Sequence, residues 1–155
     1  MNSTDNIIYT ENQASEAELS AFFYQNADLF SPVFNGGNLG ITNYAKKIKT
    51  YGLTIECRAK KNNQLVGLLV YYRNVQGNYI FIPYVCIGRA WQRKGIAFKL
   101  FCKLSSINIS NNFEYRLEVR PENKKAVSLY KRLGFDFSMN NGEKWVMVAQ
   151  SITYS

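Results

Sequence analysis

One glycine-containing turn carries the residues best suited to bind an anion. It reads Gln92-Arg-Lys-Gly95-Ile-Ala97 and joins an apolar, β-branched run to an amphipathic helical pattern. The first turn of a helix leaves backbone N–H groups without intrahelical partners, and these amides bind phosphate oxygens together with the helix dipole. Gly95 has no Cβ and lets the backbone approach a ligand closely, and Ala97 is small enough to keep that approach open. The turn therefore predicts a phosphate site.

The turn is not one of the common nucleotide motifs. It matches neither the P-loop pattern GxxxxGK[ST] nor the dinucleotide pattern GxGxxG. Taken alone, QxxGxA also fits a plain connector between a strand and a helix, so both interpretations stay open at this point.

Composition excludes several other kinds of site. The chain has no histidine, and its three cysteines (Cys57, Cys86 and Cys102) form no CxxC pair, which excludes the usual Cys/His zinc sites and His-based triads. The net charge of +8 suits an anionic ligand, but no run of five like charges occurs, so we expect no nucleic-acid partner. No stretch approaches the roughly 18–20 apolar residues of a membrane span. We expect a cytoplasmic protein without a membrane partner.

The first half of the chain is predicted to hold two helices and then a run of strands. Ser15 and Glu18 form a capping-box pattern that begins a helix over 15–27. Further strands are expected at 7–9, 53–59, 65–73 and 79–87, a loop at 30–40 and a helix at 42–49. Pro83 interrupts the strand at 79–87, and because proline cannot donate to a ladder it predicts a bulge or a sheet edge.

The second half alternates helices with strands. Residues 113–120 alternate apolar with charged side chains, which is typical of a half-buried strand. Helices are expected at 96–107 and 123–133, and strands at 135–138 and 144–150 around a turn at 140–142. The order β α α β β β α β α β β predicts a mixed α/β fold, and the length fits a single domain over residues 1–155.

A second motif, downstream of this turn, bears on what the turn does. The segment LEVRPENKKAVSLYKRLGF completes the pattern N-x-x-A-x-x-L-Y-x-x-x-G-F with Asn123, Ala126, Leu129, Tyr130, Gly134 and Phe135. Together with Gln92, Gly95 and Ala97, it resembles the GNAT (GCN5-related N-acetyltransferase) superfamily over about residues 79–135. Its LEVR portion is especially similar to the ribosomal-protein N-terminal acetyltransferases. The resemblance implies a mixed, mostly antiparallel sheet of roughly six or seven strands flanked by about four helices.

The resemblance implies that acetyl-CoA is bound as the acyl donor and that no metal takes part. The backbone amides of Arg93, Lys94, Gly95, Ile96 and Ala97, in the motif that Gln92 begins, would hold the pyrophosphate. The strand residues Val85, Cys86 and Ile87 would pair with the pantetheine arm, and Asn123 would contact the CoA arm. The chain departs from the family at Arg89, where a proline is common, and this leaves a guanidinium near the phosphates.

The resemblance also implies catalytic roles. Tyr130 would protonate the leaving thiolate, and Glu118 would act as the base toward the amine, often through water. Glu56 is an alternative base, and the backbone N–H of Val85 is a candidate oxyanion donor. On their own, Tyr130 also fits a core tyrosine, Glu118 a structural carboxylate and Asn123 a helix cap.

The acceptor is a primary amine whose identity stays open. In the family, residues 30–44 and 138–145 correspond to the acceptor region, and here they hold aromatic residues with few acids nearby. This disfavours a polycation and favours a small neutral or anionic amine, such as an amino sugar or an amino acid. A peptide N-terminus stays open because of the LEVR resemblance, as does a non-catalytic acyl-CoA-binding module. Homodimers are frequent in the family, so the resemblance allows one.

Overall fold

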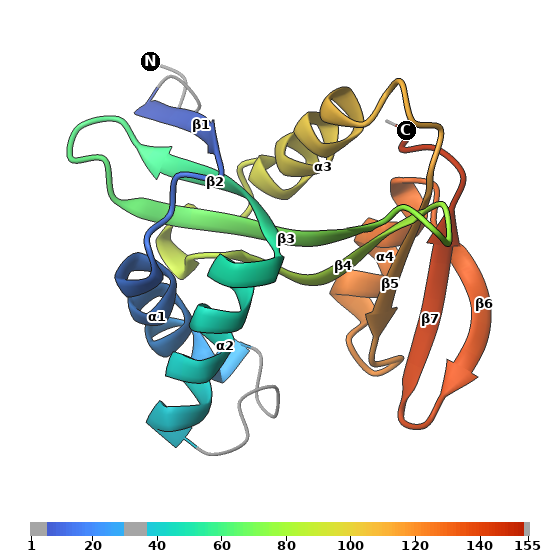
Figure 1. The fold of residues 1–155 in the computed structure, drawn as a ribbon, viewed down its shortest axis with the longest axis horizontal. Helices are drawn as coiled ribbons and strands as arrows, with labels where there is room; N and C mark the ends of the chain where they lie inside the picture. The colour runs from blue at the N-terminus through green and yellow to red at the C-terminus, as the bar shows by residue number, and fades with distance from the viewer. Residues whose placement is uncertain (1–5, 30–36, 154–155) are drawn as a thin grey trace. The chain divides into compact units, whose positions relative to one another are not determined.

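The structure is a computed structural model, and it describes residues 6–29 and 37–153. Figure 1 shows the elements along the chain. The strands are β1 (Ile7–Glu11), β2 (Leu53–Ala59), β3 (Leu65–Asn74), β4 (Tyr79–Ile87), β5 (Glu114–Val119), β6 (Asp136–Asn141) and β7 (Lys144–Ala149). The α-helices are α1 (Glu16–Gln25), α2 (Gly37–Tyr51), α3 (Ile96–Ile107) and α4 (Lys124–Arg132), and the short 3-10 helices are η2 (Ala27–Leu29) and η3 (Arg89–Trp91).

The strands form one mixed sheet in the order β1-β2-β3-β4-β5-β7-β6. β4 and β5 run parallel, whereas β1–β2, β5–β7 and β6–β7 are antiparallel pairs. The predicted fold class, a mostly antiparallel sheet with about four helices, is confirmed.

Two predicted boundaries differ from the structure. α2 begins at Gly37 and not at Thr42, because the buried stripe of Ile41, Ala45 and Ile48 stabilises the helix over the low helix propensity of its glycines. β6 continues to Asn141, although its sequence is polar, because as an edge strand it pairs only with β7. The rest of the predicted loop, residues 30–36, lies outside the described residues.

The chain divides into two compact units by its internal contacts. The first consists of Met1–Val70 with Tyr84–Leu100, and the second of Tyr71–Pro83 with Phe101–Ser155. The single domain over residues 1–155 therefore stays a prediction.

In the first unit, two helices lie side by side and supply apolar side chains to the core (Figure 1). Leu19, Phe22 and Phe23 of α1 are buried, as are nearly all residues of β2 and the first seven of β3. The predicted capping box begins α1: Glu18 N donates to Ser15 Oγ at 3.1 Å, and Ser15 N donates to Glu18 Oε1 at 3.2 Å.

Glu18 also pairs with a buried cation. Arg58 is 3% exposed and donates from Nη1 to Glu18 Oε2 at 2.7 Å and from Nη2 to Glu18 Oε1 at 3.1 Å. The hydrogen bonds from Arg58 hold the pKa of Glu18 below its usual value. The pair therefore stabilises the fold above the unfolded-state pKa of about 4.3, and this stability is lost as the pH falls through the lower folded-state pKa.

We expect Glu18→Gln to lower the free energy of unfolding at pH 7 by about 1–3 kcal/mol, because it removes the carboxylate that pairs directly with the buried Arg58 guanidinium. The estimate is kept low because the Glu18 side chain is 37% exposed. Glutamine still closes the capping box, so the loss isolates the ion pair. Urea unfolding at pH 7 and pH 3 measures it, with Glu16→Gln in the same helical turn as the control. A difference between wild type and variant that does not shrink in acid would contradict the assignment.

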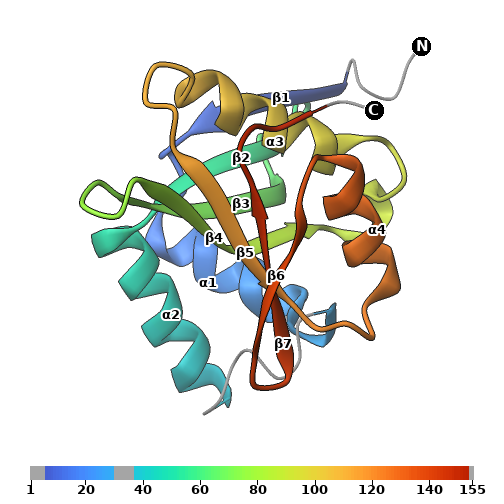
Figure 2. The ribbon, with the colours of Figure 1, turned by 90° about the vertical axis from the view of Figure 1, so that its right-hand side faces the viewer.

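In the second unit, β5 pairs with β7, and the hairpin of β6 and β7 lies beside it (Figure 2). Tyr115, Leu117 and Val119 are buried on one side of β5, as the predicted alternation requires. The rings of Phe101 from α3, Tyr130 from α4 and Phe135 meet edge to face, with centroids 5.9–6.1 Å apart.

Candidate active site

The glycine-containing turn lies in the first unit, between β4 and α3. Two of its residues have left-handed backbone conformations, Arg93 at φ +63° and Gly95 at φ +77°. The Gln92 side chain ties the turn back to the strand, since its Nε2 donates to Ile87 O at 3.0 Å. Gly88 N donates to Val66 O at 2.8 Å and holds the residue after β4 against β3. Both hydrogen bonds thus hold the turn at its β4 end.

The first two amides of α3 precede its first hydrogen bond. Lys99 N donates to Gly95 O at 3.1 Å, so the N–H groups of Ile96 and Ala97 lie in the first turn, where helix amides have no intrahelical carbonyl to bind. A Cβ built on Gly95 would meet nothing within 4 Å. The space over Gly95 is therefore open, as a close approach by a phosphate requires.

A glycine that the sequence did not single out supports this turn. A Cβ on Gly67 of β3 would meet Cys57, Ile87 and Ile96 at 3.1, 3.1 and 3.4 Å. Ile87 ends β4 and Ile96 begins α3, so Gly67 leaves room for both anchors of the turn. The only sequence signal was a glycine inside an apolar strand, which often marks a close approach.

Arg89 is paired in the structure. Its guanidinium forms an ion pair with Asp28 of η2, and both side chains are largely exposed. The pair joins the segment after α1 to the phosphate turn, a link that the sequence did not predict.

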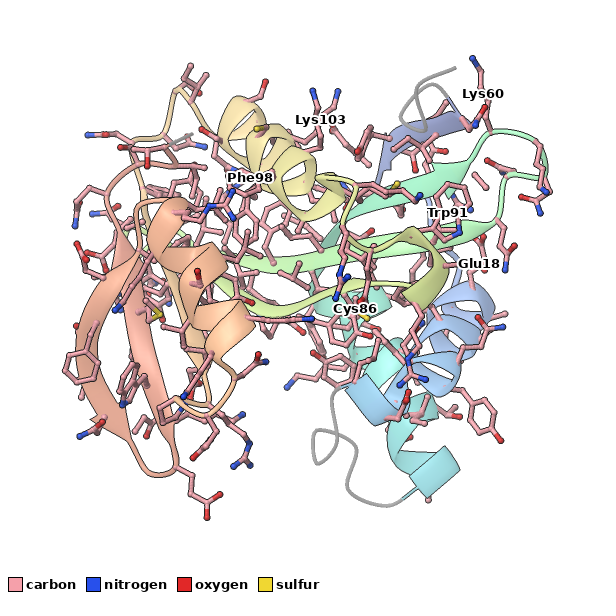
Figure 3. All side chains as sticks on the ribbon, turned by 180° about the vertical axis from the view of Figure 1, so that it is seen from behind. Glu18, Lys60, Cys86, Trp91, Phe98 and Lys103 are labelled. Atoms are coloured by element: carbon pink, nitrogen blue, oxygen red, sulfur yellow. The ribbon has the colours of Figure 1, made fainter. Side chains whose placement is uncertain are left out.

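The strand before the turn alternates buried and half-buried side chains. Cys86 is buried whereas Val85 and Ile87 are half-buried; Figure 3 labels Cys86 on β4 and Trp91 in the segment that follows. Burial raises the pKa of the Cys86 thiol to about 12, so it is not a thiolate nucleophile at neutral pH. The adjacent Tyr84 is buried against Phe23, with ring centroids 4.8 Å apart.

Of the two alternatives predicted for Pro83, the sheet edge is wrong and the bulge stays a prediction. β4 lies between β3 and β5, so it is not an edge strand, and it continues through the proline. Its pairs with β5 run from Tyr79↔Glu114 to Ile82↔Leu117 and end one residue before Pro83. Proline has no N–H to continue a ladder, which accounts for the end of the pairing.

The other predicted site residues lie in the second unit. Asn123 caps α4, since its Oδ1 accepts a hydrogen bond from Ala126 N at 3.2 Å, so the cap interpretation is confirmed. The Tyr130 ring is half-buried between Phe101 and Phe135, so packing fixes its position. A CoA contact by Asn123 and an acid role for Tyr130 stay predictions.

The two carboxylates considered as bases have different surroundings. Glu118 is half-buried in β5, and its Oε2 accepts from Asn141 Nδ2 at 3.1 Å. The arginines on either side of it pair elsewhere, Arg116 with Glu114 and Arg120 with Glu143.

Glu56, in the first unit, is fully buried. Its Oε1 accepts from the backbone N–H groups of Gln13 and Ala14, at 2.6 and 2.5 Å, just before α1 begins. This arrangement gives Glu56 a structural task, whereas Glu118 is reachable from solvent.

No group of three or more His, Cys, Asp or Glu side chains gathers in residues 6–29 and 37–153 in a way that could hold a metal ion. Within the same residues, no helix is long and apolar enough to cross a membrane.

Comparison with known proteins places this arrangement in a family. The model of the acetyltransferase (GNAT) family matches residues 17–135. No curated protein matches the chain.

Solved structures share the fold. PaiA N-acetyltransferase from Thermoplasma acidophilum in complex with coenzyme A is 16% identical, with a TM-score of 0.68 over 92% of this chain and 98% of that chain. Arabidopsis thaliana NAA60 in complex with acetyl-CoA is 13% identical, with a TM-score of 0.73 over 92% and 97%. The NatC complex bound to Gag peptide and CoA is 20% identical, with a TM-score of 0.71 over 96% and 99%. At these identities the likeness concerns the fold alone.

Proposed function

The chain belongs to the GNAT acetyltransferase family and is an acetyltransferase that uses acetyl-CoA, and from this premise we propose that it acetylates a primary amine on a small molecule. The observation that carries the proposal is the turn at Gly95, where a Cβ would meet nothing within 4 Å and the chain enters the first turn of α3. A cytoplasmic location and a homodimer stay predictions, as do the absences of nucleic-acid and membrane partners.

The geometry of the turn and of β4 supports the proposed mode of acetyl-CoA binding. The amides from Arg93 to Ala97 would surround the pyrophosphate, with Gln92 holding the turn against β4. Val85, Cys86 and Ile87 would pair with the pantetheine arm as an added strand, and the N–H of Val85 would stabilise the oxyanion. Asn123 would contact the CoA arm from the start of α4.

The chemical step needs one base and one acid. Glu118 accepts a proton from the acceptor ammonium, directly or through water, and the neutral nitrogen attacks the thioester carbonyl carbon. The nitrogen loses its second proton as the tetrahedral intermediate collapses and the C–S bond breaks. Tyr130 donates its hydroxyl proton to the departing thiolate and regains a proton from that nitrogen, directly or through water, while Glu118 releases its proton to solvent. The products are an acetamide and the free thiol of CoA.

Two observations support a different acceptor. The LEVR segment and the fold likeness to a complex bound to Gag peptide favour a peptide N-terminus as the second candidate. A non-catalytic acyl-CoA-binding module is the third. The small-molecule acceptor is preferred because few acids surround the predicted acceptor region.

Thiol release tests the function directly. The protein is incubated with acetyl-CoA and a panel of amino acids, amino sugars and short peptides, and free thiol is followed. We expect release that depends on the amine. Acetyl-CoA binding without release for any amine would favour the binding module.

We expect Glu118→Gln to lower kcat about tenfold or more near pH 7, because the amine then has no base to accept its proton. The loss should shrink as the pH approaches the pKa of the acceptor amine, where neutral amine is already abundant. A pH profile of kcat for both proteins measures this. Glu114→Gln, on the same side of β5, is the control. An equal loss at every pH would assign Glu118 a structural role.

A further inference from the structure

The end of β5 and the β6–β7 turn enclose a hollow of about 500 Å³ in the second unit. Arg120, Glu122, Glu143 and Trp145 line it. Two side-chain bonds join its two sides: Asn141 donates to Glu118 at 3.1 Å, and Arg120 donates to Glu143 at 3.1 Å. Figure 2 shows β5 beside the hairpin that carries Asn141 and Glu143. The hollow thus lies next to the base proposed above.

Charges of opposite sign are spaced regularly along β5, and the last of them, Arg120, lines this hollow. Glu114, Arg116 and Glu118 alternate with buried residues along β5, so they share one side of the sheet, and Arg120 continues the pattern past the strand's end. Residues two apart in a strand are about 6.5 Å apart along it. Glu118 and Arg120 therefore present a carboxylate and a guanidinium at a separation that one small zwitterion can span.

The two arginines beside Glu118 differ in how firmly they are held. Arg116 donates to Glu114 at 2.5 Å and lies over the Tyr79 ring, 3.9 Å from its centroid. Arg120 pairs with Glu143, whose side chain is 81% exposed and sits in a turn. Solvent-exposed ion pairs contribute little, so a ligand carboxylate can replace Glu143 more easily than Glu114. The planar fork of a guanidinium binds a carboxylate through two parallel hydrogen bonds.

We propose that the acceptor is a free α-amino acid, and that Arg120 determines this specificity. The α-carboxylate binds Arg120 in place of Glu143, and the α-amine faces Glu118. Trp145 pairs with Val119 in the register of β5 and β7, so its indole lies on the other side of the sheet from Glu118 and takes no part in this contact. This inference rests on the proposed function. It separates amino acids from peptides, because a peptide carries a neutral amide where Arg120 requires a carboxylate.

The test compares acids with their amides. Thiol release from acetyl-CoA is measured with L-phenylalanine and L-leucine and with the α-amide of each. We expect kcat/KM to be at least tenfold higher for the acids. The amine of an amide is less basic and more of it is neutral, so this preference opposes the intrinsic reactivity.

Variants assign the preference to one side chain. Arg120→Gln should raise KM for the acids and bring acids and amides within about twofold, and Arg120→Lys should keep part of the preference, since lysine retains the charge but not the fork. Arg116→Gln makes the same change at the same spacing from Glu118 and should keep the preference. Thermal unfolding of each variant identifies loss of fold, and Arg120→Lys retains a cation for Glu143.

The outcomes separate the two proposals. Amides or peptides used as well as the acids would overturn the amino-acid acceptor and leave the acetyltransferase function in place. A preference that survives in Arg120→Gln would overturn the role of Arg120. Absence of thiol release with every amine would overturn the proposed function as well.

Discussion

Replacing Tyr130 by phenylalanine is expected to lower kcat by about a hundred- to ten-thousandfold, while the affinity for CoA is nearly unchanged. General acid catalysis contributes an effect of this size, because an unprotonated thiolate is a poor leaving group from the intermediate. Phenylalanine keeps the ring between Phe101 and Phe135, which contact Tyr130 at 6.1 and 5.9 Å between centroids. The substitution therefore removes the hydroxyl and preserves the packing.

Steady-state turnover and calorimetric titration with CoA measure the two quantities separately. Tyr115→Phe is the matched control, since Tyr115 is a buried tyrosine of the same unit, on β5. It should leave turnover unchanged. Unchanged turnover in Tyr130→Phe would refute the acid role and leave Tyr130 as a core tyrosine. A parallel fall in CoA affinity would instead assign the hydroxyl to binding.

The parts of the fold that the sequence predicted are those that local signals specify. Ser15 with Glu18 marked the start of α1, and the alternation along β5 placed Leu117 inside and Glu118 outside. The Gly95 turn followed from a glycine between a strand and a helix, and its φ of +77° is a conformation that glycine adopts without strain. Each of these signals acts within a few residues of the chain.

The parts that the sequence did not predict depend on contacts between distant segments. Asp28 and Arg89 are 61 residues apart, and neither residue carries a signal that names the other. Glu56 accepts hydrogen bonds from backbone N–H groups 42 and 43 residues away, and the sequence around a glutamate in a strand does not indicate such distant partners. The polar sequence of β6 gave no alternation, since an edge strand needs no buried side, and its last residues were placed in the turn.

The Gly67 contact illustrates the same limit within the candidate site. Its neighbours Cys57, Ile87 and Ile96 come from two strands and a helix, and only the folded chain brings them within 3.1–3.4 Å of a Cβ at this position. Sequence reasoning thus placed the turn between β4 and α3 correctly but not the residue that makes room for its anchors.

The turn itself provides the second large prediction: Gly95→Asp should weaken CoA binding about thirty- to thousandfold more than Gly95→Asn. Both side chains tolerate a positive φ, and a Cβ at Gly95 meets nothing within 4 Å of the protein, so the fold should accept either. The side chains of aspartate and asparagine have nearly the same shape, so the difference in CoA affinity between the two variants measures the effect of charge. A carboxylate about 4–6 Å from a phosphate, at an effective dielectric of 20, is disfavoured by roughly 2–4 kcal/mol.

Calorimetric titration with CoA at fixed salt measures both variants, and raising the salt concentration should narrow their difference because ions screen the repulsion. Gly37→Asp and Gly37→Asn are the matched controls, since Gly37 has φ +60° and equally open space over its Cβ position. They repeat the backbone change and the charge at the first residue of α2, and the two variants should bind CoA with equal affinity. If Gly95→Asp and Gly95→Asn bind CoA equally, no phosphate lies against this turn. The pyrophosphate would then have to bind elsewhere, because the open space over Gly95 is where the chain enters the first turn of α3.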